Sequence, residues 1–486
     1  MSDDHAEKAI SAYGHDLLHT PNIDRIANEG ILFENSFVTN SICAPSRAVM
    51  LTGIYSHLNG LRDNRDRFDG DQLTYPKLLR QAGYQTAMVG KWHLKTTPQG
   101  FDYWNILIGQ GDYYNPRMIE MGDTSVHTGY TTDLITDFAL DYLESRDETR
   151  PFCMLFHHKA PHRNWMPHPR HFDLFEGKDI PLPDNFYDDY ANRSIAASEQ
   201  DMHIDDMFLH QDMKLQPNDA LPPTGTGGGP PGFADERAWA NAYGRMNEEQ
   251  KATWDAHYDP INEDFLANQP TGKELSEWKY RRYMEDYLGS VAAVDDNVGR
   301  VLDYLEENGL DENTIVVYTS DQGFYLGEHG WYDKRWMYEE SLSMPLVMKY
   351  PKEIKAGQKN QNIVLNLDFA PSFLDYAGVD IPDHMQGRSL RSLTKGESKD
   401  WRTSMYYEYF EYPHGWHSVK KHYGVRTDRY KLIHYHTDLD EWELFDLEKD
   451  PMEMKNLYGD PANKEIQQQL QEELNRLRSN LLVEGV

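Results

Sequence analysis

The sequence predicts an α/β protein with a large mixed, mainly parallel sheet flanked by helices, and a smaller C-terminal α+β subdomain that carries an antiparallel sheet. Two observations support this prediction. Up to residue 384, helical segments alternate with short apolar strands, as in sheets whose parallel strands are joined by helices. Beyond that point the chain changes to closely spaced strands rich in tyrosine, followed by a terminal helix. We therefore expect domains at 1–384 and 385–486.

The elements of the first half are marked by helix start and stop residues and by short apolar runs. The helix predicted at 20–30 has Thr20 as its cap, Pro21 in its first turn and Gly30 at its end. Further helices are expected at 43–53, 74–83 and 131–145, and strands at 31–38, 84–90 and 151–158. Each expected strand directly follows a helix or a turn, which favours helical crossovers between strands.

The second half begins with a polar insertion at 196–278, whose run LPPTGTGGGPPG predicts a flexible surface segment. A long helix follows at 280–308, because its apolar residues recur at helical spacing. The β-branched run at 313–320 predicts a fully buried parallel strand. The remaining elements are a strand at 344–350, a helix at 366–378, strands at 404–412, 422–427 and 430–436, and a helix at 463–482.

Composition restricts the classes of partner. Aspartate and glutamate number 80 against 48 lysines and arginines, for a net charge of −32, which argues against nucleic acid as a partner. An anionic substrate would therefore need a local cluster of positive charge. The sequence contains no run of about 18 apolar residues, so no membrane span is predicted. Of the two cysteines, Cys153 lies in an apolar strand and is expected to be an inert core thiol.

Cys43 differs from Cys153, because it stands in a polar turn directly before Ala-Pro-Ser-Arg. From the residues alone it could be a nucleophile, a metal ligand, a modified residue or a buried structural thiol. The stretch SICAPSRAVMLTG, residues 41–53, resembles the signature of the type I, formylglycine-dependent sulfatases of the alkaline phosphatase superfamily. A second motif of that family, GYQTAMVGKWH, lies at 83–93. The resemblance covers essentially the whole chain and is strongest to bacterial polysaccharide sulfatases.

The resemblance implies that Cys43 is oxidised after synthesis to formylglycine by a formylglycine-generating enzyme. Hydration of this aldehyde gives a gem-diol, one hydroxyl of which attacks sulfur while the other later expels sulfate. It also implies that Asp3, Asp4, Asp321 and Gln322, together with the modified Cys43, hold one divalent cation. Oxygen ligands favour Ca²⁺ or Mg²⁺ over Zn²⁺, and the family usually holds Ca²⁺. Many members have asparagine where this chain has Gln322.

The same resemblance assigns roles to five further side chains. Lys91 and Lys334 would bind the sulfate group, and Arg47 would steady the formylglycine or its metal. His93 would hydrogen-bond the gem-diol and is a candidate base, while His162 is a candidate general acid for the leaving alcohol. Four further residues are candidates for contact with the substrate, one close to the metal motif around Asp321 and three in the C-terminal subdomain: His329, His417, His422 and Arg426.

These assignments predict a sulfatase that acts on a sulfated carbohydrate, with a marine algal polysaccharide such as ulvan favoured. Two alternatives stay open: a phosphonate or phosphate ester hydrolase of the same superfamily, and a non-catalytic glycan-binding relative. The family implies a periplasmic, extracellular or cell-surface location, although the sequence shows no signal peptide. Family members usually begin with an apolar strand that runs into the paired aspartates, so we expect such a strand and a secretion signal upstream of Met1.

Overall fold

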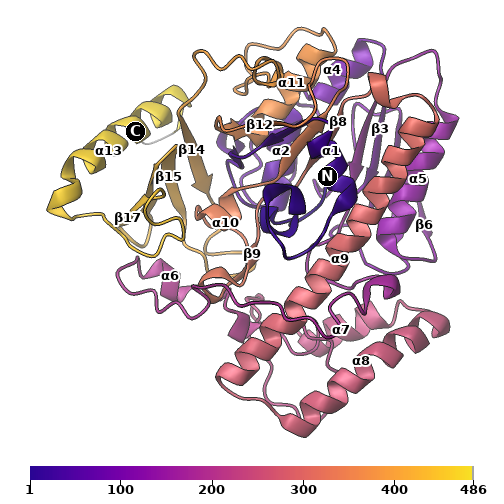
Figure 1. Ribbon diagram of the computed structural model, residues 1–486, viewed down its shortest axis with the longest axis vertical. Helices are drawn as coiled ribbons and strands as arrows, with labels where there is room; N and C mark the ends of the chain where they lie inside the picture. Colours follow the sequence, from indigo (N-terminus) through magenta and orange to yellow (C-terminus); the bar gives the residue numbers. More distant parts are fainter. Residues whose placement is uncertain (484–486) are drawn as a thin grey trace.

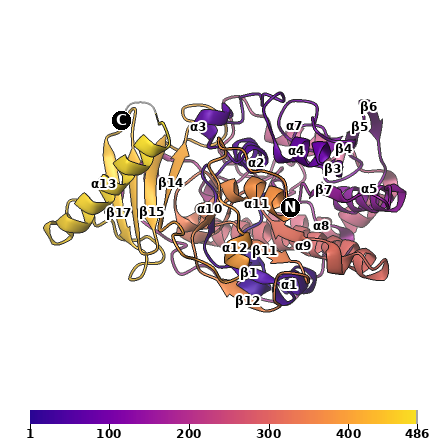
Figure 2. The ribbon, with the colours of Figure 1, turned by 90° about the horizontal axis from the view of Figure 1, so that it is seen from above.

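A computed structural model describes residues 1–483 and shows a mixed α/β domain with an antiparallel subdomain at its C-terminal end (Figure 1). The predicted fold class is confirmed. Two sheets form the centre of the molecule, and helices cover both. Figure 2 shows the four C-terminal strands with α13 at one end of the molecule and strands β3 to β6 at the other.

The first central sheet has five strands in the order β6-β5-β4-β3-β7. β3 is parallel to β4 and to β7, whereas β5 is antiparallel to both of its neighbours. Helices α4 and α5 pack against β3. The bounds are β3 Gln85–Gly90, β4 Tyr103–Leu107, β5 Arg117–Glu120, β6 Asp123–Val126, β7 Phe152–His157, α4 Tyr75–Gln81 and α5 Thr131–Ser145.

The second central sheet has four strands in the order β12-β1-β11-β8, which are β12 Gln358–Asn360, β1 Ile31–Phe33, β11 Leu346–Lys349 and β8 Val316–Thr319. The prediction of a fully buried parallel strand was wrong for β8, which pairs antiparallel with β11. Val316 and Val317 are only half-buried, because the other edge of β8 faces a cavity. A β-branched run indicates that both faces of the strand lie in an apolar environment. It does not determine whether the strand pairs parallel or antiparallel with its neighbour.

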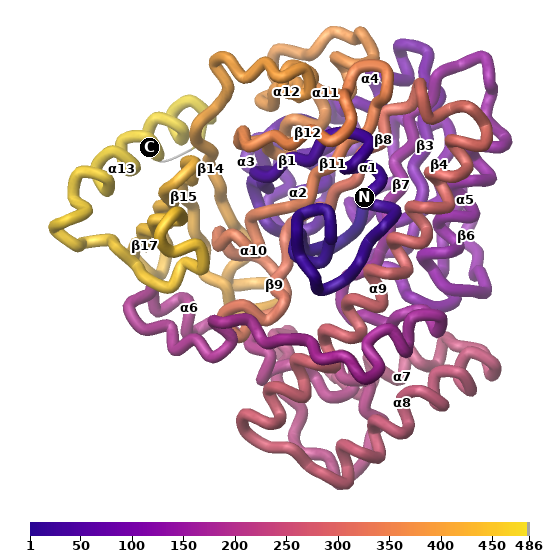
Figure 3. Tube along the Cα trace, viewed as in Figure 1, coloured from indigo at the N-terminus to yellow at the C-terminus, as the bar shows by residue number. Residues whose placement is uncertain are grey.

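Met1 and Ser2 lie between the two sheets, at the middle of the molecule (Figure 3). The Met1 amino group donates to the carbonyl of Phe156 in β7 at 2.8 Å, and the Ser2 N–H donates to the carbonyl of Thr319 in β8 at 3.0 Å. Ser2 also forms a parallel bridge with Ser320. This short link holds the following residues, Asp3 and Asp4, at the strand ends of both sheets.

The segment 196–278, predicted as a polar insertion, contains several helices; α7, α8 and the start of α9 form the lower lobe of Figure 1, and α6 lies beneath the C-terminal strands. The helices are α6 Ala196–Glu199, α7 Asp235–Tyr243, α8 Glu248–Asn268 and the first turns of α9 Lys273–Glu307. Its glycine-rich run packs against the rest of the protein: the His417 N–H donates to the carbonyl of Gly228 at 2.7 Å. A Cβ on Gly228, whose φ is +62°, would lie 1.8 Å from the His417 ring, so this approach requires glycine.

The C-terminal strands form an antiparallel sheet in chain order, covered by α13. They are β14 Ser404–Tyr409, β15 His422–Thr427, β16 Tyr430–Tyr435 and β17 Glu441–Asp446, with α13 at Lys464–Asn480. The remaining helices are α1 Pro21–Asn28, α2 Cys43–Thr52, α3 Ser56–Asn59, α10 Glu339–Leu342, α11 Phe369–Tyr376 and α12 Arg391–Thr394. Two short pairs complete the strands: β2 Ser36–Phe37 with β13 Val364–Leu365, and β9 Tyr325–Leu326 with β10 Tyr332–Asp333. Within residues 1–483, no helix is both long and apolar enough to cross a membrane.

Candidate active site

The polar residues of the two sequence motifs meet where the central strands end. Asp321 follows β8, Lys91 follows β3, and Asp4 follows the link between the sheets. The carboxyl ends of β3, β7 and β8 face the same side, which is where open α/β sheets form their sites. Cys43 comes from a helix and is the first residue of α2. The structure thus brings together residues that are up to 331 positions apart in the chain (Asp3 to Lys334).

Three carboxylates form the centre of the site. One oxygen each from Asp3, Asp4 and Asp321 lies within 4.8 Å of the other two, and all three side chains are fully buried. Among the described residues, Asp3 Oδ1 and the amide oxygen of Gln322 have no hydrogen-bond partner. Gln322 donates its Nε2 to Asp4, which leaves that amide oxygen available as a ligand. This oxygen-only donor set fits a hard divalent cation.

Three basic groups surround the carboxylates. Lys334 Nζ is 2.7 Å from both oxygens of Asp4, Lys91 contacts Asp3, and Arg47 Nε donates to Asp321 at 3.0 Å. Burial raises the pKa of Asp4 to about 7, although the Lys334 ammonium opposes that shift. Such closely packed acidic and basic groups can hold a cation and an anion side by side.

Cys43 lies beside this cluster with 1 % of its surface exposed. Its Sγ is within 4.8 Å of ligand atoms of both Asp3 and His162. Burial raises the pKa of the Cys43 thiol to about 12, although Lys334 partly offsets it. A thiol that stays protonated at neutral pH is a poor nucleophile. The geometry therefore places a reactive atom at position 43 but does not favour the unmodified thiol in that role.

Arg47 lies one helical turn after Cys43, so both side chains leave the same face of α2. Its Nη1 donates to the carbonyl of Lys91 at 2.7 Å. The Arg47 guanidinium thus connects α2 to Asp321 and to the end of β3 through two hydrogen bonds. This arrangement fixes the position of Cys43 relative to the carboxylates.

Two imidazoles complete the site. His162 Nδ1 lies 2.6 Å from the carbonyl oxygen of Arg163, so this nitrogen carries the proton and the bare Nε2 points toward Asp4, 3.8 Å away. Burial, followed by the nearby Lys91 ammonium, lowers the pKa of both His162 and His93 well below the usual value. Both rings are therefore neutral at neutral pH, and each keeps one ring nitrogen with a free lone pair.

Comparison with known proteins assigns the family. Residues 1–379 match the family described as Sulfatase, and residues 327–480 match one described as N-sulphoglucosamine sulphohydrolase, C-terminal. The chain belongs to the sulfatase family. An N-acetylglucosamine-6-O-sulfatase of Bacteroides thetaiotaomicron is 50 % identical to this sulfatase, in an alignment covering 99 % of this chain and 86 % of the relative.

Two solved structures show how far the similarity extends. A sulfatase-like protein determined in complex with D-glucosamine-2-N,6-O-disulfate superposes with a TM-score of 0.94 and 49 % identity, over 100 % of this chain and 97 % of the other. The phosphonate monoester hydrolase of Agrobacterium radiobacter has a TM-score of 0.71 at 19 % identity, over 99 % and 94 % of the two chains. The second likeness shows a shared fold alone. The protein is a sulfatase, and sulfatases generally use formylglycine and a divalent metal.

Two basic residues of this sulfatase were not predicted as part of the site, Lys159 and Arg163. Lys159 Nζ donates to the carbonyl of Arg163 at 3.1 Å and lies 4.5 Å from the ring centre of Tyr113, and burial lowers its pKa to about 8. Arg163 is buried and forms a bidentate pair with Asp212, at 2.7 and 2.6 Å. In the sequence, Lys159 and Arg163 lie on either side of His162, and this position could have indicated that they belong to the site.

Asp212→Asn is predicted to weaken catalysis because it breaks the ion pair between Arg163 and Asp212. The change removes the charge that pairs with the buried Arg163, and breaking a buried ion pair costs about 3–5 kcal/mol. We expect a lower Tm and a kcat reduced about tenfold as the His162 loop loosens, with a smaller change in KM. Sulfate release and thermal unfolding measure the two effects. The exposed Asp219→Asn in the same insertion is the matched control, and equal kcat values for the two variants would contradict the role.

Of the predicted substrate residues, only His417 lies next to the site. Its Nε2 is 3.3 Å from Asp333 Oδ2, directly before Lys334. Among the described residues, the Nδ1 of the same ring contacts the Asp201 carbonyl of the insertion at 3.2 Å. His417 therefore connects the C-terminal subdomain and the insertion to the end of β10, directly before Lys334.

The structure does not bring His329, His422 and Arg426 to the site. His329 is buried and pairs with Asp188 at 2.7 Å. His422 is buried in an aromatic cluster of the C-terminal sheet. Arg426 binds Glu339 at 2.9 Å. In this structure these polar side chains take part in packing and in ion pairs within the fold, and their contact with substrate stays a prediction.

Proposed function

We propose that this sulfatase removes the 6-O-sulfate from glucosamine residues of a sulfated glycan. The observation that carries the proposal is the 50 % identity, over nearly the whole chain, with an N-acetylglucosamine-6-O-sulfatase. The TM-score of 0.94 with a protein bound to D-glucosamine-2-N,6-O-disulfate supports the same sugar. These similarities favour glucosamine 6-sulfate over ulvan, the substrate preferred on the sequence alone.

The site supports sulfate ester cleavage through its own charges. Lys91, Lys334 and Arg47 supply positive charge for the sulfate oxygens, which explains how a protein of net charge −32 binds an anion. Formylglycine at position 43 would provide an oxygen nucleophile, and Ca²⁺ on Asp3, Asp4, Asp321 and Gln322 would add positive charge for that oxygen and the sulfate. We propose Ca²⁺ because every protein ligand is an oxygen.

The two imidazoles fit different proton transfers. His93 has a buried Nδ1 without a partner among residues 1–483, and a neutral ring suits a base. His162 presents Nε2 to the site, where it can serve the leaving sugar hydroxyl. As an acid it must first be protonated, and the negative charge of a bound sulfate group would raise its pKa in the required direction.

The substrate is tested with defined sugars, using protein co-expressed with a formylglycine-generating enzyme and supplied with Ca²⁺. We expect sulfate release from N-acetylglucosamine 6-sulfate and loss of the 6-O-sulfate alone from glucosamine 2-N,6-O-disulfate. Ulvan fragments and a 2-O-sulfated uronate should release little sulfate. Product mass and nuclear magnetic resonance assign the position that was lost. Release from ulvan but not from the glucosamine sulfates would refute the proposal.

A second candidate is cleavage of the N-sulfate. It is favoured by the match of residues 327–480 to the C-terminal region of N-sulphoglucosamine sulphohydrolase. The same disulfated sugar separates the two candidates, because a free amine appears only when the N-sulfate is removed. A phosphonate or phosphate ester included in the assay tests the remaining superfamily activity, for which the structure offers only a shared fold.

We also propose that the protein works in the periplasm, at the cell surface or outside the cell. The large, charged glycans that carry such sulfates do not cross a membrane unaided, which places the enzyme with its substrate. Fractionation of the natural source with an antibody against the chain tests this location. Recovery in the cytoplasmic fraction alone would contradict it.

A further inference from the structure

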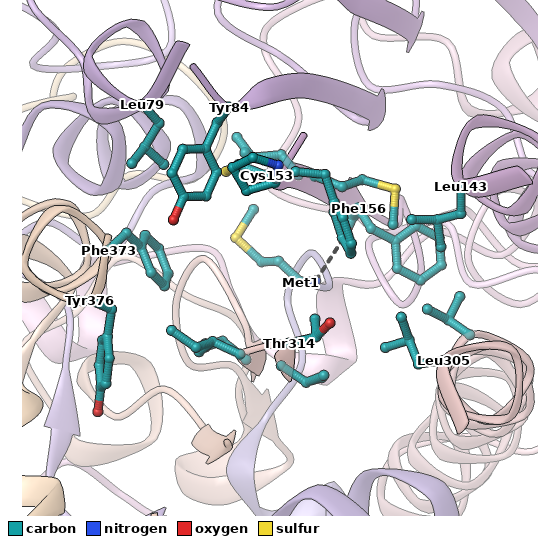
Figure 4. A pocket seen from close by; sticks show the side chains of 18 of the residues that line it. Met1, Leu79, Tyr84, Leu143, Cys153, Phe156, Leu305, Thr314, Phe373 and Tyr376 are labelled. Carbon is teal, nitrogen blue, oxygen red and sulfur yellow. Dashed lines mark hydrogen bonds between the residues drawn. The ribbon is translucent and has the colours of Figure 1, made fainter. Parts of the chain in front are cut away.

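An open groove of about 400 Å³ lies at the surface between residues 67–71 and 96–99, and its walls are mainly polar. The larger cavity beside β8, of about 710 Å³, is lined mainly by apolar side chains such as Leu143, Leu305 and Phe373 (Figure 4). Apolar walls leave the hydroxyl groups of a sugar without hydrogen-bond partners. Of these two hollows, the groove is therefore the one suited to a carbohydrate.

The side chains of the groove match the hydrogen-bonding groups of a sugar. Its polar lining consists of Arg67, Asp69, Asp71, Thr96, Thr97 and Gln99. Carboxylates accept hydrogen bonds, a guanidinium donates them, and hydroxyl and amide groups do both, as a ligand with many hydroxyls requires. All of these side chains except Thr96 are exposed, so a ligand can reach them from solvent.

The two walls of the groove begin at the active site. The Asn64 side chain accepts from the N–H of Ala44 at 3.3 Å, directly beside Cys43. One wall begins at Arg67, three positions after Asn64, and the other begins three positions after His93. Three residues span at most about 11 Å, so the groove opens close to the residues that would hold the sulfate.

Contacts between the two walls fix the shape of the groove. At the end near the site, the Phe68 N–H donates to the carbonyl of Leu94 at 3.3 Å. At the other end, Gln99 Nε2 donates to Asp71 Oδ1 at 3.4 Å. A Cβ on Gly70 would lie 2.9 Å from the same Gln99 nitrogen, so the walls approach closely there as well. The groove is thus formed by the fold before any ligand binds.

The buried site leaves only its rim for the rest of a glycan. Cys43 is 1 % exposed, and the side chains of Lys91 and Asp3 are fully buried. Only the sulfate end of a substrate reaches these atoms, and the sugars that follow must lie where the site opens to solvent. The groove continues that opening along the segment that follows His93.

Arg67 gives the groove a positive group that the fold does not use. Among residues 1–483 its guanidinium has neither an ion pair nor a hydrogen bond, whereas the neighbouring Arg65 pairs with Asp63 at 2.7 Å. Lys95 adds a second positive charge nearby, since its Nζ lies 2.9 Å from the Arg65 carbonyl oxygen. A free guanidinium binds a carboxylate or a sulfate group through parallel N–H donors.

We propose that this groove binds the sugar next to the sulfated glucosamine, with an anionic group of that sugar at Arg67 and its hydroxyls at Thr97 and Gln99. The inference rests on the proposed function, because it extends the substrate from one sugar to its neighbour in the glycan. Asp69 and Asp71 accept from hydroxyls and repel an acidic group, which confines the anion to the Arg67 end. The enzyme therefore prefers chains in which glucosamine 6-sulfate is joined to an acidic sugar.

Calorimetry with the Cys43→Ala chain and Ca²⁺ measures this binding without turnover. Three disaccharides share a glucosamine 6-sulfate and carry a uronic acid, a sulfated hexose or a neutral hexose as the second sugar. We expect at least one acidic disaccharide to bind about five- to tenfold more tightly than the neutral one, and the tighter of the two identifies the anion. Arg67→Met should remove this preference, and Arg237→Met, at an exposed position of α7, should retain it. Equal affinities with and without Arg67 would overturn the proposal.

Turnover by protein co-expressed with a formylglycine-generating enzyme separates this proposal from the proposed function. In Arg67→Met, the kcat/KM for the acidic disaccharide relative to N-acetylglucosamine 6-sulfate should fall about five- to tenfold, and the ratio cancels differences in active-enzyme content. Sulfate release from the monosaccharide with an unchanged ratio would overturn the groove and leave the proposed function intact. Binding that depends on Arg67, without any loss of 6-O-sulfate, would overturn the proposed function and retain the groove.

Discussion

Cys43→Ala is expected to abolish sulfate release, with kcat/KM falling by at least about 10³-fold. The variant keeps α2 and the carboxylate cluster, because alanine fits the helix and removes only the sulfur atom. The variant removes the side chain that, as formylglycine, would supply the proposed oxygen nucleophile beside Lys91 and Lys334. Sulfate release from N-acetylglucosamine 6-sulfate measures the loss.

The matched control is Cys153→Ala, which removes the other thiol and is expected to keep activity near that of the parent. Mass spectrometry of the peptide that contains position 43 should show the aldehyde in the parent protein. Cys43→Ser, in contrast, should be inactive and retain a sulfate ester on the serine, because a single hydroxyl can attack sulfur but cannot expel the product. Full activity of an unconverted Cys43 thiol would refute the formylglycine route.

The local elements of this fold could be predicted from the sequence where a helix or strand carries its own start and stop signals. The helix predicted at 131–145 is α5 with the same bounds, and the strand at 151–158 contains β7. The direction of β8 could not be predicted, because it depends on which strand lies beside it. Its partner β11 is 30 residues away in the sequence (Val316 to Leu346), and the apolar composition of β8 fits either direction.

The same limit applies to the site. Residues adjacent to strand ends or within a motif could be placed, as Asp321 and Lys91 show. Arg163 could not, since its role depends on Asp212, which comes from the insertion 49 positions away. The aromatic and basic strands near His422 suggested a binding surface, but the same composition also suits the interior of a small sheet.

The cation is expected to control both activity and stability. Lys91 contacts Asp3, Lys334 contacts Asp4 and Arg47 contacts Asp321, so the carboxylates offset part of the positive charge that these basic groups offer to a sulfate. A divalent cation shifts this balance by two positive charges. We therefore expect chelation to remove activity and lower Tm, and Ca²⁺ to restore both.

Asp321→Asn tests this balance at one atom and is expected to lower kcat/KM by about 10²–10³-fold, with weaker Ca²⁺ binding. The amide keeps the shape of the side chain but withdraws the charge that Arg47 contacts at 2.9 Å, which leaves a buried guanidinium without its partner. Asp428→Asn, at an exposed position, is the matched control. Excess Ca²⁺ should recover part of the activity of Asp321→Asn, since the remaining carboxylates still bind the cation. If calorimetry shows unchanged Ca²⁺ affinity while activity is lost, Asp321 serves to orient Arg47 and does not bind the metal.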